Sequence, residues 1–162
     1  MNQVLRDELQ QDPEQLGYAP LIAAGNMAGL AALLNETDPL RLMSRETFVT
    51  GRGVLADLGV SGAVILEKLS QFGATPQQDP QAEGLRLAVK WAMKFAEQEG
   101  EGIDIGHPNT RALMQTAAAV GVLTEGEATL LLNLAVLPVS RAVELLGCDV
   151  SVNEVTEAVN GG

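Results

Sequence analysis

Apolar residues recur along most of the chain at the three- and four-residue spacing that places them on one face of an α-helix. Ile65, Leu69 and Phe72, for example, stand at i, i+4 and i+7. No stretch alternates apolar and polar residues convincingly enough to indicate a half-buried strand. The pattern predicts helical segments over residues 3–11, 21–24, 27–34, 45–58, 61–72, 79–99, 108–120, 124–135, 139–146 and 152–159.

These segments predict an all-α fold, an irregular bundle of about six to eight short helices with at most a minor strand pair. Asp38 and Pro39 are predicted to open a turn, with the proline at the first position of a helix. Residues 121–123 and 136–137 are short apolar connectors, and either leaves room for a brief strand.

Two helix starts carry a reciprocal capping pattern. Thr124 with Glu127, and Ser151 with Glu154, fit the capping box, in which a hydroxyl and a carboxylate satisfy each other's backbone amides. Gly59 is predicted to end the helix that precedes it. Helices should therefore begin at residues 124 and 151 whatever the tertiary arrangement.

The most linker-like stretch is residues 74–78, with the sequence ATPQQ. It predicts a boundary between an N-terminal helical half, residues 1–73, and a C-terminal helical half, residues 79–162. The two halves could also form one continuous domain, because 162 residues is an ordinary length for a single domain.

Composition changes this picture in three ways. Hydrophobic residues make up 46% of the chain but aromatics only 3%, so the core is expected to consist of alanine, leucine and valine. The net charge of −11 repels phosphate groups, which disfavours direct binding to nucleic acid or to an anionic membrane. The longest apolar run, residues 128–139, is interrupted by Asn133 and Pro138, so no membrane insertion is expected.

Two further features bear on the compartment. Cys148 is the only cysteine, which excludes an internal disulfide, and it is expected to be a buried or half-buried structural thiol. Residues 1–15 are acidic and lack the basic and apolar regions of a signal peptide. We therefore expect synthesis in the cytoplasm.

Candidate chemistry is sparse. His107, the only histidine, has no ligand partner at metal spacing, so a loop or helix-cap role is favoured over proton transfer. The acids Glu97, Glu99, Glu101 and Asp104 surround a glycine-rich loop, but their spacing is not that of a calcium-binding loop and indicates a solvated acidic rim. No catalytic residue, metal or cofactor is predicted.

Residues 51–56 match the string GxGxxA, which occurs in dinucleotide-binding sites. Such a site needs a strand before the glycines, and the preceding residues are predicted to be helical. Small residues at a close helix crossing are the favoured explanation.

Three aromatic residues are candidates for a protein interface: Trp91, Phe95 and Tyr18. Trp91 and Phe95 are one helical turn apart and lie beside Lys90 and Lys94. An interface anchor and an ordinary core pair explain Trp91 and Phe95 equally well.

Two parts of the chain resemble a family of small helical virion proteins of tailed bacteriophages. The first comprises residues 8–13 (ELQQDP), 16–19 (LGYA) and 31–35 (AALLN), and the second comprises residues 107–135 and 139–147, the latter reading VSRAVELLG. Residues 40–101 do not take part in the likeness. The resemblance implies a bacterial host and a tail-associated structural protein, present in multiple copies or as a homo-oligomer and bound to other phage structural proteins. It supplies no catalytic residues.

Three hypotheses follow. The first is a non-enzymatic structural component of a tailed-phage virion, at the tail or tail tip, that binds other virion proteins through helix faces. The second is a phage assembly chaperone or soluble adaptor that is absent from the mature particle. The third is a small metal-dependent hydrolase that uses His107 with acids of residues 97–104.

Overall fold

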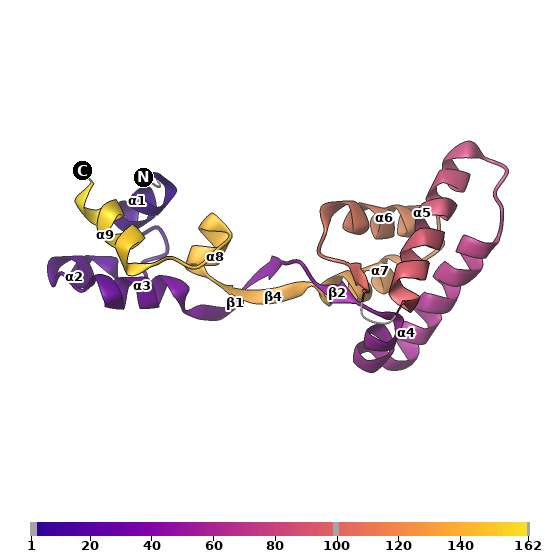
Figure 1. Ribbon diagram of the computed structural model, residues 1–162, viewed down its shortest axis with the longest axis horizontal. Coiled ribbons are helices and arrows are strands. Elements are labelled where there is room, and N and C mark those ends of the chain that lie inside the picture. Colours follow the sequence, from indigo (N-terminus) through magenta and orange to yellow (C-terminus); the bar gives the residue numbers. More distant parts are fainter. Residues whose placement is uncertain (1–2, 99–100, 162) are drawn as a thin grey trace. The chain divides into compact units, whose positions relative to one another are not determined.

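The computed structural model describes residues 3–98 and 101–161, and these are predominantly helical (Figure 1). The predicted helical class is therefore confirmed, with strands as a minor component. Within the described residues the helices number nine, slightly more than the predicted six to eight, and α2 and α8 are only six residues long. The helices are α1 (Gln3–Gln11), α2 (Tyr18–Ala23), α3 (Met27–Asn35), α4 (Gly51–Ala74), α5 (Pro80–Glu97), α6 (Pro108–Ala119), α7 (Glu125–Asn133), α8 (Arg141–Leu146) and α9 (Val152–Asn160).

In the part of the chain that the structure describes, four strands form two pairs, where at most one pair was expected. β1 (Thr37–Ser44) pairs with β4 (Val136–Ser140), and β2 (Phe48–Val49) pairs antiparallel with β3 (Ile103–Asp104). The brief strand allowed at residues 136–137 is present in β4. The helix predicted from Pro39 is wrong, because residues 37–44 find a strand partner far away in the sequence, and such pairing overrides local preference.

The helix predicted for residues 45–58 begins later, because Phe48 and Val49 are paired in β2. Thr50 is the N-cap of α4, and its side chain accepts a hydrogen bond from the amide of Gly53. The predicted helix end at Gly59 is present as a break inside α4, where two helical segments meet at a kink: the φ of 55° and ψ of −128° of Gly59 are non-helical, a conformation that glycine adopts without a Cβ penalty.

The chain divides into two compact units, but not at residues 74–78. Unit 1 combines the described residues up to Met43 with those from Pro138 onward, and unit 2 comprises Ser44–Leu137. Residues 74–78 lie inside unit 2, where α4 and α5 pack closely: a Cβ on Gly73 would lie 3.2 Å from Lys90 Cα. The predicted halves fail because both ends of the chain belong to one core, which local composition does not reveal.

Unit 1 is a cluster of short helices in which α9 contacts α1 and α3 (Figure 1). Leu5, Leu30, Leu34 and Val155 are among the fully buried apolar side chains of its core. The capping box predicted at Ser151 is present at the start of α9.

A buried ion pair joins α1 to α8 at the edge of this core. The Arg141 guanidinium donates from Nε to Glu8 Oε1 at 2.8 Å and from Nη2 to Glu8 Oε2 at 2.7 Å. Tyr18 donates its hydroxyl hydrogen to the same Glu8 oxygen at 3.0 Å. Burial, together with the nearby Glu8 carboxylate, raises the pKa of Tyr18, and the Glu8 hydrogen bonds raise the pKa of Arg141.

Unit 2 packs α4, α5, α6 and α7 around a separate apolar core. Ile65, Val89, Ile105 and Ala117 are buried within it. The capping box predicted at Thr124 is present at the start of α7. None of the described helices has the length and apolar character needed to cross a bilayer.

Replacing Gly106 by alanine is expected to destabilise unit 2 by about 1–3 kcal/mol. A Cβ at this position would lie 1.8 Å from the carbonyl oxygen of Arg45, and a backbone atom cannot rotate out of the way. Urea unfolding followed by the fluorescence of Trp91, the only tryptophan, measures the effect.

Gly84→Ala is the matched control, because it adds the same methyl group where nothing lies within 4 Å. It is expected to stabilise the protein by about 0.5–1 kcal/mol, since alanine favours a helix interior over glycine. Changes of the same sign in both variants would contradict the steric explanation.

Candidate interaction surface

Helix α5 is held firmly on its inner side. Asp79 caps it, accepting a hydrogen bond from the amide of Ala82 at 2.8 Å, and Pro80 occupies the first turn. Val89 and Ala96 are buried, and the buried Arg86 donates to the carbonyl of Gly73 in α4 at 2.7 Å. These contacts place the opposite side of α5 on the surface.

That outer side carries three large apolar residues on successive turns, Leu87, Trp91 and Phe95, which we call the aromatic stripe. Their exposed fractions are 42%, 54% and 44%. The Trp91 and Phe95 rings tilt by 34° with their centroids 6.4 Å apart. A free surface rarely keeps such side chains together without a partner, so the aromatic stripe is the strongest candidate site.

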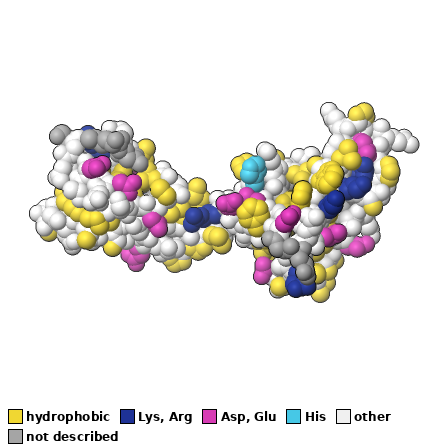
Figure 2. Space-filling view, viewed as in Figure 1, with side chains coloured by type: hydrophobic (Ala, Val, Ile, Leu, Met, Phe, Trp, Pro, Cys, Tyr) yellow, Lys and Arg dark blue, Asp and Glu magenta, His cyan; other side chains and the backbone are white. Residues whose placement is uncertain are grey.

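Two lysines run along one side of the aromatic stripe. Lys94 Nζ lies 4.7 Å from the centroid of the Trp91 ring, a cation–π contact. Within the described residues, neither Lys90 nor Lys94 forms an ion pair with a carboxylate, whereas Arg41, Lys68, Arg86 and Arg141 do. Figure 2 shows basic side chains beside exposed hydrophobic ones on unit 2. Glu83 is paired with Arg86, and Glu97 lines the same hollow as the two lysines, so the lysines still give this edge of the stripe a net positive charge on an acidic protein.

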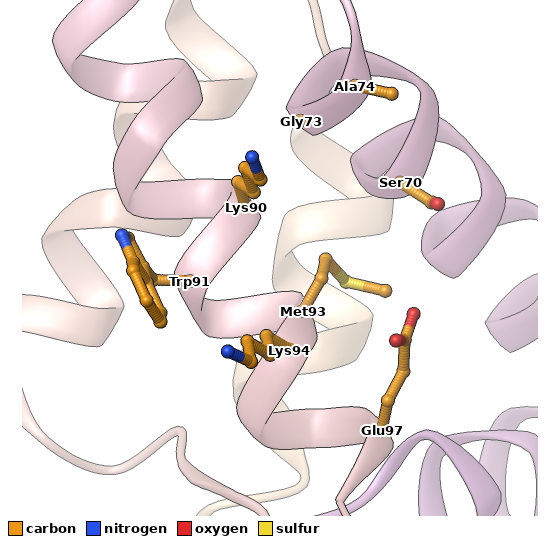
Figure 3. A pocket seen from close by; sticks show the side chains of 8 residues that line it. All are labelled: Ser70, Gly73, Ala74, Lys90, Trp91, Met93, Lys94 and Glu97. Atoms are coloured by element: carbon orange, nitrogen blue, oxygen red, sulfur yellow. The ribbon is translucent and has the colours of Figure 1, made fainter.

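A hollow of about 430 Å³ lies between α5 and α4, beyond the lysines. In Figure 3, Met93 and Glu97 lie on the side of α5 that faces α4, whereas the Trp91 ring lies on the other side of the helix, and all three line the hollow together with Lys90 and Lys94. The wall formed by α4 consists of Ser70, Gly73 and Ala74. The charged side chains that line the hollow, Lys90, Lys94 and Glu97, all come from α5, so charged groups do not converge from both walls on a small ligand.

The exposed fractions decide between the two explanations of Trp91 and Phe95. An ordinary core pair would be buried, so only the interface explanation is retained, as a prediction. The prediction of Tyr18 as an interface residue is corrected by the structure. Tyr18 is fully buried in unit 1 and hydrogen-bonded to Glu8, so it is not available as a surface anchor. A lone tyrosine before a helix does not reveal from sequence which way its ring faces.

His107 is a helix cap, as favoured. Its Nδ1 accepts a hydrogen bond from the amide of Asn109 at the start of α6. Asp104 is also occupied, since one carboxylate oxygen accepts from the amides of Thr47 and Gly106 at 2.8 and 2.9 Å. Glu99 lies outside the described residues. No three His, Cys, Asp or Glu side chains in the described part of the chain are placed to hold a metal.

Residues 51–56 differ from expectation, because a short strand, β2, does precede them and Gly51 does begin a helix. The strand pairs antiparallel with β3, however, and not with a parallel neighbour as in a dinucleotide-binding unit. The expectation that Cys148 is buried or half-buried is wrong: it is exposed, because it lies just beyond the C-cap of α8.

The exposed Leu40 and Leu42 of β1 were not predicted as surface residues of interest, although their two-residue spacing is typical of one face of a strand.

The contribution of Glu83 to the stability of the folded state should depend on pH and should be lost in acid. Hydrogen bonds from Arg86 and from the Gln77 amide lower the pKa of Glu83 from 4.5 to about 2. Because the folded pKa is the lower one, the contribution is present above pH 4.5 and is lost as the pH falls toward 2. We expect the difference in unfolding free energy between the wild type and Glu83→Gln to shrink over that window. Urea unfolding at a series of pH values measures it, and a constant difference would contradict the assignment.

Comparisons with family models, with curated proteins and with solved structures found no match to this chain.

Proposed function

We propose that this chain is a non-enzymatic structural component of a tailed-phage virion, at the tail or tail tip, which binds other virion proteins through exposed helix faces. The observation that carries the binding role is the aromatic stripe. The only tryptophan of the chain is more than half exposed, although its burial would favour folding. Tryptophan is among the residues most enriched at the energetic centres of protein interfaces.

The phage context comes from the resemblance to small virion proteins of residues 8–13, 16–19, 31–35, 107–135 and 139–147. Much of this likeness lies in features that shape the fold. One is the ELQQDP segment at the end of α1, where Asp12 accepts hydrogen bonds from the amides of Leu16 and Gly17. Another is the capped start of α7. The resemblance therefore supports a shared architecture, and the aromatic stripe supports a role in contacts.

Mass spectrometry of gradient-purified phage particles, compared with the infected-cell lysate, tests this function. We expect the chain in the particles at a constant ratio to the major tail protein, and cryo-electron density for it at the tail. If the chain is abundant in the lysate but missing from particles, the structural role is wrong and an assembly chaperone or adaptor takes its place.

A further inference from the structure

We propose that the aromatic stripe of α5 is the docking site for an acidic amphipathic helix of a partner protein. This inference rests on the proposed structural role and names the chemistry of the partner at that site. Leu87 and Phe95 are eight positions apart, which is about 12 Å along a helix. A partner helix with apolar residues at i, i+3 or i+4, and i+7 presents a stripe of matching length.

Gly84 supports the approach of a second backbone. It lies on the surface of α5, one turn before Leu87, and nothing of the described chain lies within 4 Å of a Cβ built on it. A glycine inside a helix is destabilising compared with alanine, and the packing of unit 2 offers no compensation for it. The gap it leaves continues the aromatic stripe and lets another helix come close to α5.

Charge selects the partner. Lys90 and Lys94 border the aromatic stripe on one side, and the cation–π contact keeps the Lys94 ammonium over Trp91. The other side of the stripe is bordered by the uncharged Ala88. Carboxylates along one edge of a partner helix would face the two lysines, whereas a basic helix would be repelled.

The other occupants are less well matched. A second copy, docking stripe to stripe, would bring the same two lysines and no carboxylate on the stripe itself. Nucleic acid would meet the stripe favourably but would be repelled by the net charge of −11. An acidic helix is the occupant that satisfies both the apolar and the charged parts of the surface.

Trp91 makes the test direct, because it is the only tryptophan and lies at the centre of the aromatic stripe. The full chain is titrated with a designed tryptophan-free helical peptide that has leucines at i, i+4 and i+7 and glutamates beside them. A matched peptide carries lysine in place of every glutamate. We expect the acidic peptide to cause a saturable shift of Trp91 emission to shorter wavelength. Its dissociation constant should be at least about tenfold lower than that of the basic peptide.

A charge-matched pair of variants separates local from global electrostatics. Lys90→Gln with Lys94→Gln lowers the net charge by two, and so does Val60→Glu with Val120→Glu, which alters exposed residues elsewhere in unit 2. The lysine variant should bind the acidic peptide about three- to tenfold more weakly. The valine variant should bind it like the wild type, and circular dichroism checks that both variants are folded.

Several outcomes would overturn the docking site. These are equal affinities for the acidic and the basic peptide, no emission shift with either peptide, or an equal loss of affinity for the acidic peptide in the lysine and the valine double variants. An emission shift on raising the protein concentration alone would assign the stripe to a second copy, and a tighter response to anionic vesicles or single-stranded DNA would assign it to those. The proposed virion role is judged separately, because peptide binding can persist when the chain is absent from particles, and can fail when it is present.

Discussion

Replacing Arg141 by alanine is expected to lower the free energy of unfolding of unit 1 by about 3–5 kcal/mol. Arg141 and Glu8 expose only 9% and 5% of their surface, and the guanidinium holds both carboxylate oxygens of Glu8. Without Arg141, the buried Glu8 carboxylate would keep the hydrogen bond from the Tyr18 hydroxyl but would lose its paired positive charge. An uncompensated buried charge is among the most destabilising single changes.

The network around Arg141 extends beyond one pair. Its Nη1 also donates to Glu14 at 2.6 Å and to Glu144 at 2.7 Å, and Arg41 of β1 pairs with the same two carboxylates. Losing Arg141 therefore leaves an excess of negative charge around α8. This adds to the expected loss, although the outer carboxylates are partly screened by solvent.

Urea unfolding measures the effect when it is followed by near-ultraviolet circular dichroism of Tyr18. Tyr18 is the only tyrosine and belongs to the core of unit 1. The control is the double variant Glu8→Gln with Arg141→Met, which removes both charges. It should be less destabilised than Arg141→Ala, because no charge is then left buried without its partner. A loss below about 1 kcal/mol in Arg141→Ala would show that Glu8 is adequately solvated without the arginine.

The second large effect is expected at Ile65. Ile65→Ala should destabilise unit 2 by about 2–5 kcal/mol, the range for removing a large aliphatic side chain from a packed core. Ile65 is fully buried on α4, within the core shared with α5, α6 and α7. Three carbon atoms are removed, and the rigid helices around them relax only partly.

Val64→Ala is the neighbouring control, since Val64 is on the same helix but is 43% exposed. Its effect should stay within about 0.5 kcal/mol, because little apolar burial is lost and alanine is the better helix former. Urea unfolding monitored by Trp91 fluorescence reports both variants. If both variants lost a similar amount of unfolding free energy, the assignment of Ile65 to the buried face of α4 would be wrong.

Local pattern was a good guide wherever a helix depends on its own residues. The capping boxes at Thr124 and Ser151 are present because each joins side chain and backbone within three residues. The i, i+4 spacing of Ile65 and Leu69 placed both in the core of unit 2. The helix-cap role of His107 was likewise readable, because its partner, Asn109, is two residues away.

Exposure of the candidate site was less readable. The spacing of Leu87, Trp91 and Phe95 put them on one side of α5, but not on the inside or the outside of the protein. Arg86 and Val89 are buried on the inner side instead, so α5 faces α4 through these residues. The burial of Tyr18 had the same origin, since it depends on Glu8 and on the packing of α1, α3 and α9.

The sequence by itself determined the helical class, most helix positions and the acidic charge, because these depend on residues within a few positions of one another. Only the tertiary structure decided the two units, the strand pairs and the ion pair between Glu8 and Arg141, whose partners are far apart along the chain. The reason is physical: a pairing between residues far apart along the chain is selected by the whole core that closes around it, and no local spacing encodes that choice.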